Sequence, residues 1–150
     1  MKILIATDGS PFSDVAVNEV IERPWPSESE FRVLTVMESS PFPYVSTDVY
    51  ALPLDQTLAK ARSVVEQIAN SASNRIKSKG LNVTHFVRQG VTAEEILDEA
   101  KRWGADLIVV GTHGGRGISR FLLGSVAQRI ATHAHCSVEI VRKPGLFSKQ

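Results

Sequence analysis

Short apolar runs alternate along the chain with segments whose apolar residues recur at helical spacing. The runs Ile3–Ala6 and Leu107–Val110 are continuous rather than alternating apolar and polar, which is typical of strands covered on both faces of a sheet. The segment Phe31–Met37 is rich in valine and leucine and predicts another strand. The pattern as a whole predicts five strands, at Lys2–Ala6, Phe31–Met37, Asn82–Arg88, Asp106–Val110 and Ser137–Arg142.

One helix is predicted between each pair of successive strands. The first should have Ser10 as its N-cap and Pro11 in the first helical position. The third should open with a capping box in Thr92-Ala93-Glu94-Glu95 and stop at Gly104. The apolar positions that define the four helical faces are Ala16, Val17, Val20 and Ile21, then Leu58, Ala61, Val65, Ile68, Ala72 and Ile76, then Ile96, Leu97, Ala100 and Trp103, then Val126, Ala127, Ile130 and Ala131.

The order βαβαβαβαβ predicts an α/β fold. Because crossovers between parallel strands are right-handed, such a chain forms a doubly wound parallel sheet with helices on both faces. Ligands of these sheets bind beyond the carboxyl ends of the strands. Two predicted loops lie at that edge, the proline-containing segment Glu38–Pro53 and the glycine-rich segment Gly111–Gly117.

Length and composition fit one ordinary domain. The chain has 150 residues, and we expect the domain to span residues 1–144 with residues 145–150 as a flexible tail. Its 17 basic residues against 16 acidic ones, without any run of five like charges, argue against a nucleic-acid-binding surface. The apolar run near the start is too short for a signal peptide or a membrane span, and a single cysteine fits a reducing compartment. We therefore expect a cytoplasmic protein without membrane association.

Four glycines fall within seven residues directly after the predicted strand Asp106–Val110. A loop with glycine at several positions can turn successive N–H groups toward one point and form an anion nest. The helix that begins near Gly124-Ser125 would aim its positive N-terminus at the same place. A turn that only lets the chain leave the sheet is the alternative. The spacing, Gly111-Thr112-His113-Gly114, nine further residues and Gly124-Ser125, favours a phosphate site.

This glycine spacing resembles the ATP-binding signature of the universal stress protein family. The resemblance extends to Lys2-Ile3-Leu4-Ile5-Ala6-Thr7-Asp8-Gly9-Ser10, to Leu122-Leu123-Gly124-Ser125-Val126 and to the closing segment His133–Arg142. In that last segment Cys136-Ser137 stands where many members have a proline-containing pair. The resemblance implies a five-stranded parallel sheet of order 3-2-1-4-5, and commonly a homodimer. This chain keeps the glycine pattern of the members that bind ATP.

The resemblance also implies a nucleotide site. Val36 would meet the adenine edge, Asp8 the ribose or a phosphate-bound Mg²⁺, and the glycine segments the triphosphate. The nucleotide-binding residues are then Ala6, Thr7, Asp8, Val36, Gly111, Thr112, His113, Gly114, Gly115, Arg116, Gly117, Gly124, Ser125 and Val126.

Asp8 and His113 each have a second interpretation. An aspartate before glycine is common in turns, where its side chain accepts a local backbone hydrogen bond. Because a lone carboxylate repels a polyanion, Asp8 can only assist ATP binding through Mg²⁺ or a ribose hydroxyl. His113 either contacts phosphate or is a solvated loop residue.

Two functions remain open from the sequence. The first is a nucleotide-sensing homodimeric module of the stress response, in which ATP occupancy alters the dimer or the contacts with a protein partner. The second is a slow ATP-hydrolysing or phosphotransferring enzyme that uses the same pocket. Walker, dinucleotide-binding and nucleophile-elbow motifs are missing from the sequence, which favours the first. The resemblance places the dimer contact on the fifth strand, Val138–Val141, as an unpaired sheet edge.

Overall fold

Five strands and four helices alternate along the chain in the computed structural model, which describes residues 1–39, 54–113 and 123–142. Their order is β1 (Lys2–Ala6), α1 (Pro11–Glu22), β2 (Glu30–Glu38), α2 (Leu54–Lys77), β3 (Asn82–Gly90), α3 (Thr92–Trp103), β4 (Leu107–Gly111), α4 (Ser125–His133) and β5 (Ser137–Val141). The predicted βαβαβαβαβ order is therefore confirmed, with β1 as predicted and the ends of the other strands shifted by at most two residues.

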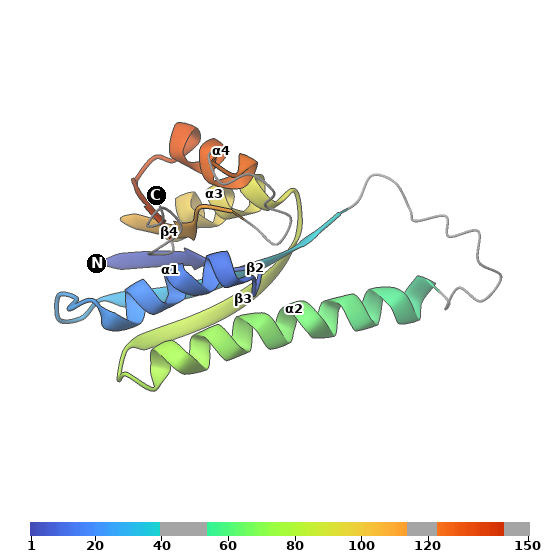
Figure 1. Ribbon diagram of the computed structural model, residues 1–150, viewed down its shortest axis with the longest axis horizontal. Helices are drawn as coiled ribbons and strands as arrows, with labels where there is room; N and C mark the ends of the chain where they lie inside the picture. Colours follow the sequence, from blue (N-terminus) through green and yellow to red (C-terminus); the bar gives the residue numbers. More distant parts are fainter. Residues whose placement is uncertain (40–53, 114–122, 143–150) are drawn as a thin grey trace, which may run out of the picture.

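The strands form one parallel sheet in the order β3-β2-β1-β4-β5 (Figure 1). This confirms the order that the family resemblance implies. β1 lies in the centre, with Ile5 opposite Val33 of β2 on one side and opposite Val109 of β4 on the other. The chain thus reverses its winding direction at β1, which is where doubly wound sheets bind their ligands.

Each face of the sheet carries its own hydrophobic core. Helices α1 and α2 cover one face and α3 and α4 the other, as Figure 1 shows. Alternate residues of β1 serve the two cores: Ile3 and Ile5 pack under α1 and α2, whereas Leu4 and Ala6 pack under α3 and α4. Burial on both faces explains why the β1 sequence is continuously apolar.

The helix ends test the capping predictions. Ser10 caps α1, since its Oγ accepts the backbone N–H of Ser13 at 3.3 Å, and Gly104 ends α3 with a left-handed backbone at φ 71°. The predicted capping box of α3 is wrong. Its N-cap is Val91, which has no hydrogen-bonding side chain, and Thr92 already lies inside the helix, with its hydroxyl donating to the carboxylate of Glu38.

The predicted apolar face of α2 is covered only in its second half. Ala72 and Ile76 are buried, whereas Leu58, near the start of the same face, is 46% exposed. The first half of the helix runs past the other helices (Figure 1). The predicted loop lies outside the described residues from position 40 to 53, as does the predicted tail at 145–150. No described helix has the length and apolar content needed to cross a bilayer.

Candidate functional site

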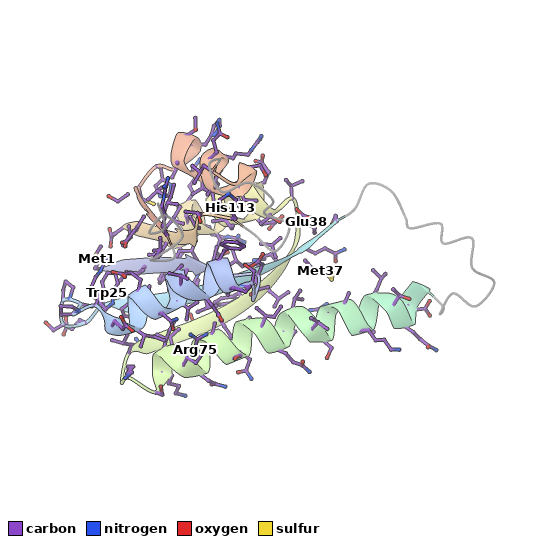
Figure 2. All side chains as sticks on the ribbon, viewed as in Figure 1. Met1, Trp25, Met37, Glu38, Arg75 and His113 are labelled. Carbon is purple, nitrogen blue, oxygen red and sulfur yellow. The ribbon has the colours of Figure 1, made fainter. Side chains whose placement is uncertain are left out.

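Residues from three segments meet at the carboxyl edge of the sheet. β1 ends at Ala6 and the chain continues through Thr7 and Asp8. β4 ends at Gly111 and continues through Thr112 and His113, and α4 begins after Gly124. In Figure 2, Met1 and Trp25 lie at the amino end of the strands and Met37 and Glu38 at the carboxyl end. The first turns of two helices, α1 and α4, pack against the same β4 extension.

Gly111 allows the start of α1 to approach β4. A Cβ at this position would lie 2.3 Å from the carbonyl oxygen of Phe12 and 3.1 Å from the Cα of Ser13. Both contacts are to backbone, which cannot rotate away as a side chain could. Glycine at position 111 therefore has a packing reason of its own, and it fixes the start of α1 over the end of β4.

Gly124 allows the start of α4 to approach the residues that follow β4. Its N–H donates to the carbonyl oxygen of Thr112 at 2.8 Å, and a Cβ on it would lie 2.9 Å from that oxygen. Gly124 is also the N-cap of α4 and offers no side-chain acceptor to the first N–H groups of the helix. The positive end of α4 is thus held beside Thr112 without a side-chain cap, which suits it to an anion.

Asp8 belongs to a network of hydroxyl groups at the start of α1. Its Oδ1 accepts the backbone N–H of Ser10 at 3.0 Å and the hydroxyl of Ser13 at 2.8 Å. The Ser13 hydroxyl also lies 3.0 Å from Oγ1 of Thr7, which is buried. The turn interpretation of Asp8 is therefore realised, while the residue remains exposed to solvent at the edge of the site.

An apolar wall lies next to these polar groups. Ala6 and Val36 belong to the core under α3 and α4, together with Leu123 and Val126 at the start of α4. Val36 and Val126 are half-buried, so part of each side chain faces outward. Three of the predicted site residues, Ala6, Val36 and Val126, thus share one apolar surface.

His113 lies between the two helix starts rather than in open solvent. Its ring packs against Phe12 of α1 at a centroid distance of 5.5 Å, and Figure 2 labels it in the layer between α1 and α4. Its Nε2 is buried and finds no hydrogen-bond partner in the part of the chain that the structure describes. A buried ring nitrogen without a partner is costly, which favours a role for His113 toward a polar ligand.

The structure brings together most of the predicted site and adds to it. Gly114, Gly115, Arg116 and Gly117 lie outside the described residues. Phe12 and Ser13 are the residues that sequence reasoning missed. The sequence places both residues in the first turn of the first helix. It does not show that this turn packs on Gly111, because that contact depends on β1 and β4 being neighbours in the sheet.

Comparison with known proteins identifies the family. The model of the universal stress protein family matches residues 1–142. The chain belongs to this family. Universal stress protein MJ0531 of Methanocaldococcus jannaschii is 34% identical over 147 residues, which cover 95% of this chain and 82% of that protein.

Solved structures of other universal stress proteins and related chains have the same fold. The hypothetical protein MJ0577 superposes with a TM-score of 0.81 at 23% identity, covering 96% of each chain. A universal stress protein family protein of Arabidopsis thaliana, solved with AMP bound, superposes with a TM-score of 0.72 at 20% identity, covering 97% of this chain and 93% of that one. At these identities the two likenesses establish the architecture, not the ligand.

Proposed function

We propose that this universal stress protein binds an adenine nucleotide at the carboxyl ends of β1 and β4. One observation carries the proposal: the uncapped N-terminus of α4 and the first turn of α1 pack on the same residues, 111–113. The bound AMP of the Arabidopsis family member supports adenine nucleotides as the ligand class. ATP is the ligand that we propose, because the glycine spacing of this chain matches the ATP-binding members.

Each part of the nucleotide would meet a different chemistry. Phosphate oxygens would accept hydrogen bonds from the backbone N–H groups at the start of α4 near Ser125 and from Nε2–H of His113. The apolar wall of Ala6 and Val36 would take the adenosine. Asp8 would act through Mg²⁺ or a ribose hydroxyl, since its carboxylate would otherwise repel the phosphates. Gly114 to Gly117 and Arg116 would complete the phosphate contacts.

The biological role that we propose is that of a nucleotide sensor in the cytoplasm. The domain of residues 1–144 would form a homodimer, and nucleotide binding would alter the contacts of this dimer with a protein partner. Edge strand β5 supports the dimer. Because the carbonyl of Val141 accepts the N–H of Thr112 in the β4 extension, the backbone groups of Val141 face β4 and those of its neighbour Ile140 face outward. A second copy could pair with this outward side.

Ser125 offers a test of nucleotide binding that does not depend on unfolding the protein. It is exposed in the first position of α4, where an added carboxylate favours the helix by about 0.3–1 kcal/mol. We expect Ser125→Asp to melt no lower than the parent but to bind ATP at least about tenfold more weakly in calorimetry. Ser125→Asn is the matched neutral control. Unchanged ATP affinity in Ser125→Asp would refute the phosphate position.

A measurement of ATP turnover distinguishes the two candidate functions, a nucleotide-sensing module and an ATP-hydrolysing or phosphotransferring enzyme. With labelled ATP and Mg²⁺, a module retains intact nucleotide, whereas an enzyme releases many equivalents of product. Loss of that turnover in Asp8→Asn would favour the enzyme.

A further inference from the structure

A buried carboxylate on α3 holds three arginines on the face of the sheet that α3 covers. One of them, Arg88, is the β3 neighbour of Val36, but none belongs to residues 111–113 or to the start of α4, where the phosphates of the nucleotide are proposed to bind. Glu99 is only 1% exposed. Its Oε1 accepts an N–H of Arg32 at 2.6 Å, and its Oε2 accepts one from Arg88 at 3.0 Å and one from Arg102 at 2.7 Å. The three arginines come from β2, β3 and α3, so this cluster, the Glu99 cluster, exists only in the folded sheet.

The charges of the Glu99 cluster do not balance. Three guanidinium groups against one carboxylate leave a net charge of +2. At the margins, Lys2 lies over the Trp103 ring at 5.6 Å and Asp98 precedes Glu99 on α3, and their opposite charges leave the sum unchanged. A structural ion pair needs only one arginine for one carboxylate, so the charges of the two partly exposed arginines, Arg88 and Arg102, are left for solvent or for a bound anion to compensate.

Aromatic rings and the carboxylate of Glu99 position the guanidinium groups of the cluster. The guanidinium of Arg32 stacks between two rings, 4.3 Å from the centroid of Trp103 and 4.7 Å from that of Phe86. Arg88 lies 5.9 Å from the same Phe86 ring. Arg88 and Arg102 meet on one oxygen atom, Oε2 of Glu99, so their guanidinium groups must lie side by side. Glu99 therefore positions the N–H donors of two neighbouring guanidinium groups, those of Arg88 and Arg102, before a ligand binds.

The cluster is open on one side. The side chains of Arg88 and Arg102 are 34% and 55% exposed, while Glu99 is covered. Each guanidinium carries more N–H donors than the one that it gives to Glu99. The solvent side of the cluster thus presents N–H donors that Glu99 does not use, and the exposed Phe86 ring borders them.

We propose that the Glu99 cluster is a second anion site, distinct from the proposed phosphate position at the start of α4, which takes a phosphate group of a small molecule on Arg88 and Arg102. A phosphate dianion matches the net charge of +2, whereas a single carboxylate would leave half of it uncompensated. Two adjacent guanidinium forks also suit the several oxygens of phosphate. Glu99 contacts the arginines and not the ligand, so it is a positioning residue.

Nuclear magnetic resonance of the arginine Nε–Hε groups tests this proposal on the whole chain. Titration with inorganic phosphate should shift the Arg88 and Arg102 signals and saturate, with half-saturation at about 1 mM or below. Chloride at the same ionic strength should not produce these shifts. In the same spectra the backbone amide of Ser125 reports phosphate at the nucleotide site, so the two sites are read independently.

Substitutions assign the shifts to the cluster. Arg88→Gln should weaken the phosphate response of Arg102 at least about tenfold, and Arg102→Gln should do the same to Arg88. Arg62→Gln is the matched control, because Arg62 is 73% exposed on α2, outside the cluster. The backbone amide spectrum of each variant shows whether it is folded, and Arg88→Lys keeps the charge if Arg88→Gln does not fold.

A second probe distinguishes inorganic phosphate from an organic phosphate ester. Phenyl phosphate should bind more tightly than inorganic phosphate if the ligand body lies on Phe86, and Phe86→Ala should then remove the difference. Equal binding of the two probes assigns the site to inorganic phosphate. Shifts that do not saturate, that chloride reproduces, or that survive Arg88→Gln in a folded protein would overturn the proposal.

Discussion

The carbonyl oxygen of Phe12 occupies the space that a side chain on Gly111 would need, 2.3 Å from the point where a Cβ would lie. This close approach, together with the packing of Phe12 on His113, joins the first turn of α1 to the end of β4. It also means that Gly111 is required by packing, whether or not phosphate approaches it.

Gly111→Ala should therefore destabilise the protein. The added methyl group has to displace the backbone of α1, and overpacking of this kind costs about 1–3 kcal/mol. Gly80→Ala is the control, since nothing lies within 4 Å of a Cβ there and only its left-handed φ of 79° is strained. Urea denaturation should show a larger loss for Gly111→Ala than for Gly80→Ala. An equal or smaller loss would mean that α1 can shift freely over β4.

Glu99→Gln should lower the free energy of unfolding by about 3 kcal/mol, because it leaves three arginines around a neutral side chain. Arg62→Gln, which breaks an exposed pair with Glu66, should cost well under about 1 kcal/mol. Chemical denaturation at neutral pH measures both. A loss for Glu99→Gln as small as that for Arg62→Gln would show that the cluster contributes little to folding.

The same carboxylate predicts a pH dependence. Burial alone would raise the pKa of Glu99, but hydrogen bonds from Arg32 and Arg88 and the charge of Arg102 outweigh it and hold this pKa below its ordinary value of 4.5. A lowered pKa in the folded state stabilises the protein above pH 4.5, and this stabilisation is lost as the pH falls through the folded value. The parent should thus lose more stability than Glu99→Gln between about pH 7 and about pH 3. Parallel curves for the two proteins would contradict the assignment.

Asp8→Asn should change the melting temperature little. The amide oxygen of asparagine can still accept the N–H of Ser10 and the hydroxyl of Ser13 that Asp8 now accepts. The lost charge should weaken ATP binding in the presence of Mg²⁺, and in EDTA as well if Asp8 contacts the ribose. Calorimetry with and without Mg²⁺ distinguishes the two cases. A variant that melts far lower yet binds ATP normally would leave Asp8 with a turn role alone.

Ile140→Pro should disrupt the proposed dimer without unfolding the protomer. The N–H that proline removes faces away from β4, so the pairing of β5 with β4 does not use it, and an edge position tolerates proline. We expect a folded monomer in sedimentation, with the helix content of the parent. Glu139→Pro is the contrasting variant, since it removes a donor on the β4 side and should unfold the strand. A parent that is monomeric at micromolar concentration, or a dimeric Ile140→Pro, would rule out a β5 interface.

The prediction of the α3 capping box shows where local patterns mislead. Thr92-Ala93-Glu94-Glu95 has the right residues, yet the helix begins one residue earlier than a cap at Thr92 requires. The backbone pairing of β2 and β3 continues to Ser39 and Gly90, whose N–H and carbonyl lie 3.1 Å apart. That long pairing brings Glu38 next to Thr92 and gives the hydroxyl a partner outside the helix. The outcome depended on a residue far away in the chain.

The amino-acid sequence by itself determined the alternation of strands and helices and the caps at Ser10 and Gly104, and it indicated the segments at which we propose a ligand site. These features depend on hydrophobic period and on the backbone preferences of single residues, which are local properties. Only the tertiary structure decided that Phe12 packs on Gly111 and His113, that Ile140 faces outward, and that three arginines converge on Glu99. Such contacts join positions far apart in the chain, and strand order and register select them from many pairings that the same local patterns allow.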